Sequence, residues 1–131
     1  IELIEQVKKE GDTIGGKVAC IVRGLKPGLG EPVFDKLHAD IAKAMMGINA
    51  VKAFEIGSGV EAASMRGSAH NDVFQKDGST ITNHSGGIQG GISNGNDIVC
   101  QITFKPVATI MKDQETIDNR GNRQNLPFGI L

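Results

Sequence analysis

The sequence predicts an α+β fold in which helices pack against an antiparallel sheet. Apolar residues recur every three to four positions, as on one face of a helix, in two segments: 1–10 and 32–46. Strand-like apolar runs occupy three segments: 15–23, 48–56 and 98–104. A polar, glycine-rich stretch separates the last two strands. The order helix, strand, helix, strand, long loop, strand therefore indicates a sheet that is covered by helices.

Both predicted helices have recognisable ends. In the first, Ile1, Ile4 and Val7 lie on one side and Gly11 follows the end. In the second, proline suits the first helical position, residue 32, and Gly47 ends the helix. Its expected core face is a stripe of residues spaced by four: Val33, Leu37, Ile41 and Met45. Charged residues are expected on the opposite side: Asp35, Lys36, Asp40 and Lys43.

The three strands differ in how they are covered. Apolar residues point to both sides in 15–23, so both faces of this strand can be buried. The strand 98–104 alternates, which is typical of a half-buried strand. Between 48–56 and the long loop, the small residues of 57–68 leave room for a helical turn or two. After Met111 no pattern predicts an element.

The composition excludes several classes of protein. With 131 residues, the chain fits one domain or one piece of a larger protein. A net charge of −1 gives no broad basic surface for nucleic acid. Only 4% of the residues are aromatic and none is Trp or Tyr, which argues against base stacking. No run of about 18 apolar residues predicts a membrane-spanning helix.

The beginning of the chain and its cysteines indicate the cellular compartment of the protein. The first residues lack the layout of a signal peptide. There is no initiator Met, and we expect the natural N-terminus to be missing. Cys20 and Cys100 both lie in predicted strands. We therefore expect free, buried thiols in a cytoplasmic protein rather than a disulfide.

The run of glycines from Gly86 to Gly95 is the strongest candidate for a ligand site. Glycine lets the backbone approach a flat or charged ligand and exposes N–H donors. The run is neither a Rossmann fingerprint nor a phosphate-binding P-loop, because it lacks the required strand, helix and Gly-Lys-Ser/Thr. The alternative is a compact turning loop, with Asn94 and Gly95 forming a hairpin turn into the last strand.

Other polar residues carry weaker hypotheses. The three histidines, His38, His70 and His84, lack metal-ligand spacing, so no metal site is expected. The last two could serve in acid–base chemistry or simply lie at the surface. Arg66 with the pair at 71–72 could bind an anion or form an exposed ion pair. The segment 105–109 leaves the last strand with a cation and a hydroxyl, which suits a phosphate or cofactor; the alternative is a lysine that is simply solvated.

Several stretches together resemble chorismate synthase, in the family's order and spacing. The resemblance covers about residues 10 to 122. It rests on these stretches: Gly28-Leu29-Gly30-Glu31-Pro32-Val33-Phe34-Asp35-Lys36-Leu37; Ile48-Asn49-Ala50-Val51-Lys52; Glu55-Ile56-Gly57; Arg66-Gly67-Ser68; Asn83-His84-Ser85-Gly86-Gly87-Ile88-Gln89-Gly90-Gly91-Ile92-Ser93-Asn94-Gly95; and Phe104-Lys105-Pro106.

The resemblance implies a β-α-β sandwich, in which a helical layer lies between antiparallel sheets. It implies a cytoplasmic homotetrameric lyase that removes phosphate from enolpyruvylshikimate phosphate by an anti 1,4-elimination, using reduced FMN. It leaves open whether the parent reduces its own flavin with NADPH. The family's flavin-contacting positions correspond to these residues: Asn49, Ala50, Gly90, Lys105, Pro106, Val107, Ala108 and Thr109.

The departures from the family indicate a central fragment. The family's Ser-His-Gly motif, its second catalytic histidine and its substrate-binding arginines have no counterpart here, so no catalytic residue is assigned. The Gly-Arg-His-Asp-Pro segment is also absent, and 123–131 is expected to be an unmatched tail, such as a cloning artefact or a mis-joined end. We therefore expect 1–122 to be an inactive part of a synthase. The alternative is a non-catalytic α+β binding or assembly module.

Overall fold

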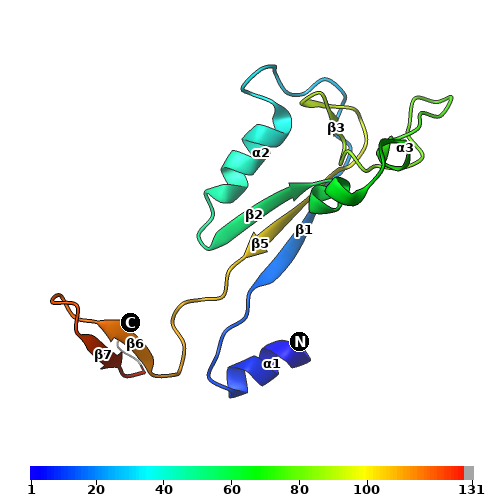
Figure 1. Cartoon of the computed structure of the whole chain (residues 1–131). Coiled ribbons are helices and arrows are strands. Elements are labelled where there is room, and N and C mark those ends of the chain that lie inside the picture. Colours follow the sequence, from blue (N-terminus) through cyan, green and yellow to red (C-terminus); the bar gives the residue numbers. More distant parts are fainter. Residues whose placement is uncertain (129–131) are drawn as a thin grey trace. The chain divides into compact units, whose positions relative to one another are not determined.

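The computed structural model describes residues 1–128, which form two compact units. One unit combines residues 1–16 with the chain from residue 105 onward, and the other contains residues 17–104. Figure 1 labels the elements along the chain. The larger unit carries the sheet, whose strands are β1 (Gly16–Val22), β2 (Val51–Ile56) and β5 (Ile98–Phe104). Its other elements are α2 (Leu37–Met46), the 3-10 helix η1 (Gly59–Ser64), α3 (Gly67–His70), β3 (Ile88–Gln89) and β4 (Ile92–Ser93).

The sheet has the strand order β1-β5-β2, with β5 in the middle. β2 and β5 pair antiparallel, and their register runs from Val51 opposite Phe104 to Ile56 opposite Cys100. An irregularity between Val51 and Ala53 interrupts the ladder near the start of β2. The predicted α+β class with an antiparallel sheet is therefore confirmed, although the predicted strand 48–56 begins only at residue 51.

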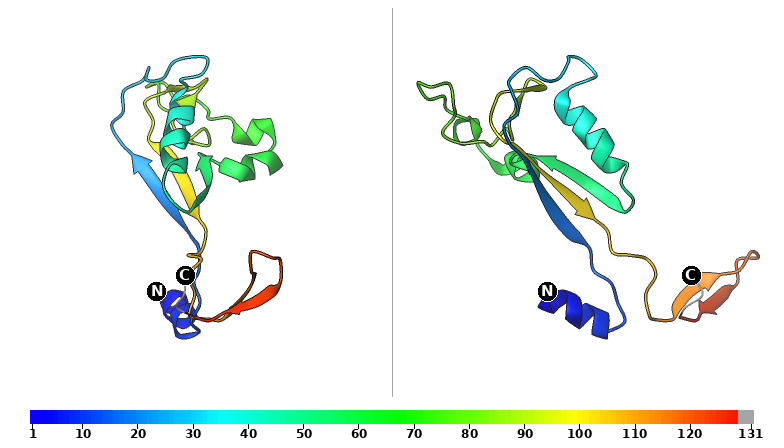
Figure 2. Two further views of the ribbon diagram at one scale, coloured as in Figure 1. Left: turned by 90° about the vertical axis from the view of Figure 1, so that its left-hand side faces the viewer. Right: turned by 180° about the vertical axis from the view of Figure 1, so that it is seen from behind.

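Helix α2 lies across one face of this sheet (Figure 2). Its Ile41 and Met45 pack against a buried cluster of Val51, Cys100 and Ile102. These two helical residues belong to the predicted stripe, which is correct in this part of the helix. Both cysteines are free, as expected, and Cys100 is buried. Burial raises the pKa of the Cys100 thiol, and the nearby Cys20 contributes to the same rise.

The start of α2 differs from the prediction. The helix begins at Leu37 rather than at residue 32, and Val33 is 68% exposed instead of being in the core. Glu31 donates its N–H to the Asp35 carbonyl at 2.9 Å, which closes residues 31–35 into a turn. Lys36 is extended, and the Leu37 N–H donates to the carbonyl of Gly91 at 2.8 Å. A bond to a distant loop therefore sets the helix start.

The long predicted loop of residues 69–97 is folded. It contains the end of α3, a bridge between Phe74 and Thr80, and the antiparallel hairpin β3–β4. Gly86, Gly87 and Ile88 are buried within it. The small size of glycine lets the loop backbone pack directly on the sheet. Because this packing needs no apolar side chains, the sequence shows no hydrophobic pattern here.

The smaller unit consists of α1 (Glu2–Lys9), the segment after β5 and the hairpin β6 (Gln114–Ile117) with β7 (Arg123–Leu126). The Met111 N–H donates to the Gly11 carbonyl at 2.8 Å, and Lys112 pairs with Asp12 at 2.7 Å. The hairpin had no sequence signal. The predicted tail begins with β7, and residues 129–131 of that tail lie outside the described residues. Across residues 1–128, no helix is long and apolar enough to cross a membrane.

Candidate ligand-binding site

Gly90 lies at the exposed tip of the β3–β4 hairpin. Gly90 and Gly91 are the two residues between the strands, with φ of +61° and +91°. Positive φ at both positions is the requirement of a type I′ turn. The chain does turn at Asn94 and Gly95 before β5, where the Asn96 N–H donates to Asn94 Oδ1 at 3.0 Å, but the hairpin turn itself lies at Gly90 and Gly91. A Cβ atom at Gly90 would meet no atom within 4 Å, so the tip faces open space.

Ser93 holds the base of this hairpin. Its hydroxyl donates to the Lys26 carbonyl at 2.7 Å and accepts the Leu29 N–H at 2.9 Å. The Ser93 carbonyl accepts the N–H of Gly28 at 2.9 Å. The residue is 3% exposed, so these bonds are shielded from water. Together with the bond from Leu37 to Gly91, they fix the hairpin against α2 and the loop before it.

Asp72 is the hydrogen-bond acceptor at the centre of the loop that precedes the hairpin. Its Oδ1 accepts the Thr82 hydroxyl and the His84 N–H, both at 2.7 Å, and its Oδ2 accepts the Ser85 N–H at 2.9 Å. The side chain is fully buried. Burial acts to raise the pKa of this carboxyl, but the hydrogen bonds from Ser85, Thr82 and His84 outweigh it and hold the pKa well below its usual range.

The sequence suggested that Arg66 and residues 71–72 form an anion site or an exposed ion pair, but Asp72 is buried and is not exposed for either role. The carboxylate points inward and its acceptor sites are taken by its own loop. His84 Nδ1 lies 3.3 Å from Asp72 Oδ1, and this buried nitrogen has no hydrogen-bond partner among residues 1–128. The rings of His70 and His84 lie 5.5 Å apart. The structure thus places His84 beside the buried carboxylate and His70 beside the ring of His84.

Asn83 joins this loop to the sheet. Its side chain donates to the Asp97 carbonyl at 2.8 Å and accepts the Gly87 N–H at 2.8 Å. The Ser58 N–H donates to the His84 carbonyl at 2.8 Å, so the loop also bonds to the residues after β2. The loop is thereby fixed to both neighbouring strands at one end of the sheet.

Asn49 and Ala50 form a turn at the other end of α2. The Val51 N–H closes the turn on the Ile48 carbonyl at 3.3 Å. Ala50 has a φ of +68°, a conformation that residues other than glycine rarely adopt. Because Gly91 bonds to the first residue of the ten-residue α2, the Gly90 hairpin and this turn are about 15 Å apart, the length of the helix. The structure therefore does not bring Ala50 and Gly90 into contact.

The other predicted site residues, 105–109, belong to the smaller unit and have no regular secondary structure. All five are exposed. Lys105 directly follows Phe104, the partner of Val51 in the ladder. The Val107 carbonyl accepts the Thr13 hydroxyl at 2.6 Å. This bond attaches the segment to the chain after α1.

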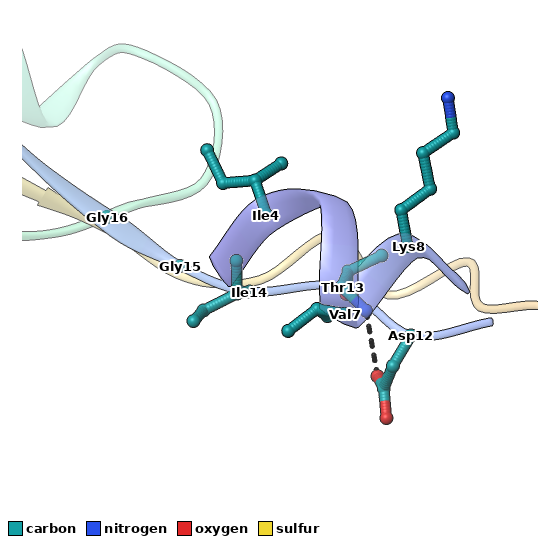
Figure 3. Close-up of a pocket in the computed structure, with 8 residues that line it drawn as sticks. All are labelled: Ile4, Val7, Lys8, Asp12, Thr13, Ile14, Gly15 and Gly16. Atoms are coloured by element: carbon teal, nitrogen blue, oxygen red, sulfur yellow. Dashed lines mark hydrogen bonds between the residues drawn. The ribbon is translucent and has the colours of Figure 1, made fainter. Parts of the chain in front are cut away.

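Thr109 lines a cavity of about 160 Å³ together with Lys8 and Asp12. The cavity thus brings together a cation, a hydroxyl and a carboxylate. Lys105, the cation that the sequence suggested beside Thr109, does not line this cavity, whereas Lys8 does. A second cavity, about 400 Å³, lies beside α1 (Figure 3). Apolar side chains of Ile4, Val7 and Ile14 line much of it, and it contains none of the predicted site residues.

Within residues 1–128, no group of three or more His, Cys, Asp or Glu side chains is arranged to hold a metal ion. The larger unit supplies an exposed glycine tip and a turn with unusual backbone geometry. The smaller unit supplies the small polar cavity at Thr109. Sequence reasoning missed Asp72 as a structural acceptor. Its position shortly before a polar loop rich in N–H donors was the available signal.

These observations define the chain as an α+β protein whose glycine hairpin is held in place by hydrogen bonds. Comparison with known proteins identifies the family: a family model described as chorismate synthase matches residues 1–127. The chain belongs to the chorismate synthase family. This confirms the resemblance drawn from the sequence motifs.

Individual relatives agree with this assignment. A chorismate synthase of Christiangramia forsetii is 60% identical over 119 residues, covering 91% of this chain and 34% of the relative. One of Akkermansia muciniphila is 56% identical over 129 residues, covering 96% of this chain and 36% of the relative. A crystal structure of chorismate synthase is 37% identical, with a TM-score of 0.78, and the match covers 82% of this chain and 34% of the other. The chain thus spans about a third of the length of its relatives.

Proposed function

We propose that this chain is part of a chorismate synthase and supplies a portion of its flavin-binding scaffold. The reaction is the elimination of phosphate from enolpyruvylshikimate phosphate, carried out by a cytoplasmic homotetramer. Family membership over residues 1–127 supports this proposal. Reduced FMN, when bound, supplies the transient electron donation that the family's reaction requires.

The open tip at Gly90 is the observation that best supports a ligand role. A hairpin held from below by buried bonds at Ser93 presents a backbone surface without a side chain. A planar ring can approach such a surface closely. Ala50 adds a second indication, because unusual backbone conformations persist where function requires them. A ligand that touches both must be extended, as a flavin with a ribityl phosphate chain is.

For the segment 105–109 of the smaller unit, the family resemblance supports a contact with the polar part of the flavin. Lys105 supplies a cation for an anionic group, and Thr109 supplies a hydroxyl donor. We assign no catalytic residue to this chain, so it binds and orients rather than transferring protons.

The chain alone is expected to be inactive. In an anaerobic assay with reduced FMN and enolpyruvylshikimate phosphate, we expect no phosphate release above background. Groups that hold the substrate in reactive geometry supply several kcal/mol of barrier lowering, on the order of 7–11 kcal/mol in favourable cases. Turnover by the purified chain would overturn this assignment of roles.

The flavin role of Gly90 is tested by Gly90→Asn in the intact synthase. Asparagine is favoured at the first position of a type I′ turn, so the hairpin is retained while a side chain enters the open space. We expect FMN binding at least about tenfold weaker, which is about 1.4 kcal/mol, with an unchanged melting temperature. Binding is followed by flavin fluorescence with substrate present.

Gly121→Asn is the matched control. Gly121 also has a positive φ of +82° and open space around its Cβ position, but it lies in the turn between β6 and β7. We expect this variant to bind FMN like the unmodified protein. If Gly90→Asn also binds FMN normally, the hairpin is a folding feature and the cofactor lies elsewhere.

A further inference from the structure

We propose that Asp72 is the positioning residue of the β3–β4 hairpin: its buried carboxylate sets the loop from Thr82 to Gly87 and thereby the placement of Gly90. The proposal rests on the proposed function for what the hairpin touches. It goes further because it assigns a role in ligand binding to a side chain that is fully buried.

The acceptor at this position has to be a carboxylate. Three donors from Thr82, His84 and Ser85 converge on the two oxygens of one fully buried side chain. A carboxylate can accept all three, whereas an asparagine amide has one acceptor oxygen and one NH₂ group. An amide at this position would therefore turn a donor toward either a hydroxyl or a backbone N–H. Buried donors that lose their acceptors destabilise the loop that carries them.

The loop that Asp72 holds is directly connected to the hairpin. Only Gly86 and Gly87 separate Ser85 from the first residue of β3. Gly87 is held on both sides: its N–H donates to Asn83 at 2.8 Å, and its carbonyl accepts the Asn94 N–H at 3.0 Å. Both glycines are buried, so the segment cannot swing into solvent without breaking these contacts. A displacement at Ser85 is therefore transmitted to β3.

The His84 ring lies beside the same carboxylate. Its Nδ1 is buried, lies 3.3 Å from Asp72 Oδ1 and has no hydrogen-bond partner in the described part of the chain. A lone pair on this nitrogen would face the carboxylate oxygen, so the nitrogen carries the hydrogen. Because no hydrogen bond forms there, the anchoring of the loop rests on the Thr82 hydroxyl and on the backbone N–H groups of His84 and Ser85. His84 is attached to the same loop, which concentrates the anchoring on one segment.

The test compares Asp72→Asn with Asp77→Asn as a matched control. Asp77 lies in the same part of the chain and accepts two hydrogen bonds from Ser79, but it is exposed. Amide hydrogen exchange is measured by NMR in this chain. For Asp72→Asn we expect at least tenfold faster exchange at Ser93 and Asn94, with unchanged exchange in β5. For Asp77→Asn we expect no change at these amides.

The same variants are then introduced into the intact synthase. Asp72→Asn is expected to weaken FMN binding about tenfold, while Asp77→Asn leaves it unchanged. If hairpin exchange is unchanged in Asp72→Asn, or if it accelerates without any loss of FMN affinity while Gly90→Asn does lose affinity, the positioning role is wrong. If neither Asp72→Asn nor Gly90→Asn affects FMN, the proposed flavin site itself has failed.

A milder variant guards against global unfolding of Asp72→Asn. Thr82→Val keeps the side-chain shape and removes one donor, and it leaves the carboxylate and its other bonds in place. We expect a two- to fivefold acceleration of exchange confined to the loop and hairpin. Uniform acceleration across β2 and β5 as well would show that Asp72 supports the whole fold rather than the hairpin, and would overturn the proposal.

Discussion

Replacing Gly57 by alanine should destabilise this chain far more than the same change at Gly90. The two glycines have nearly equal φ angles, +55° and +61°. They differ in their surroundings. A Cβ atom at Gly57 would overlap the carbonyl oxygen of His84 and lie 2.6 Å from the nitrogen of Gly86, whereas at Gly90 it would meet nothing within 4 Å.

The expected losses of stability follow from the backbone conformation and from the space around the added methyl group. The left-handed conformation costs an alanine about 1–2 kcal/mol, and this is the whole expected loss at Gly90. At Gly57 the added methyl group also displaces backbone, for which overpacking costs of about 1–3 kcal/mol are typical. The total of about 2–5 kcal/mol approaches the stability of a small domain, about 5–15 kcal/mol. Gly57→Ala should therefore be only marginally folded.

Urea denaturation of both variants measures the difference directly. Because the conformational term is common to both, the difference in the free energy of unfolding reports how closely the loop at His84 packs on the end of β2. We expect at least about 1 kcal/mol more destabilisation at Gly57. Equal losses in the two variants would show that the loop and the strand are not in contact, and would refute the packing on which the Asp72 argument also depends.

Three further predictions concern the core, pH and the thiols. Ile41→Ala should cost about 2 kcal/mol in urea denaturation, near the low end for core truncation because Ile41 is only partly buried; Lys43→Ala should cost less than about 0.5 kcal/mol. The depressed pKa of Asp72 implies stability that is present above the ordinary aspartate pKa of about 3.9 and lost as pH falls through the lower folded value. The stability advantage over Asp72→Asn should thus hold from pH 7 to about 4.5 and shrink below pH 4 in acid titration. A thiol reagent should modify Cys20 before Cys100, because Cys100 is buried with a raised pKa, and equal rates by mass spectrometry would contradict this.

The sequence alone determined the fold class, the existence of the strand β5, the core-facing residues at 41 and 45 and the family. These features depend on local periodicity, since the side of a helix or strand on which a residue lies follows from its spacing. They also depend on the order of short motifs, which needs no knowledge of packing. The glycine run was recognised as a candidate site for the same local reason.

Only the tertiary structure decided where α2 begins, which residues make the hairpin turn and what Asp72 does. Leu37 starts the helix because its N–H meets the carbonyl of Gly91, a residue far along the chain. The turn lies at Gly90 because β3 and β4 pair there, although Asn94 and Gly95 have equally suitable turn chemistry. An aspartate in a polar loop resembles a surface residue in sequence; it becomes a buried acceptor only when Thr82, His84 and Ser85 fold around it, since hydrogen bonding to a carboxylate requires donors that the chain brings together in space.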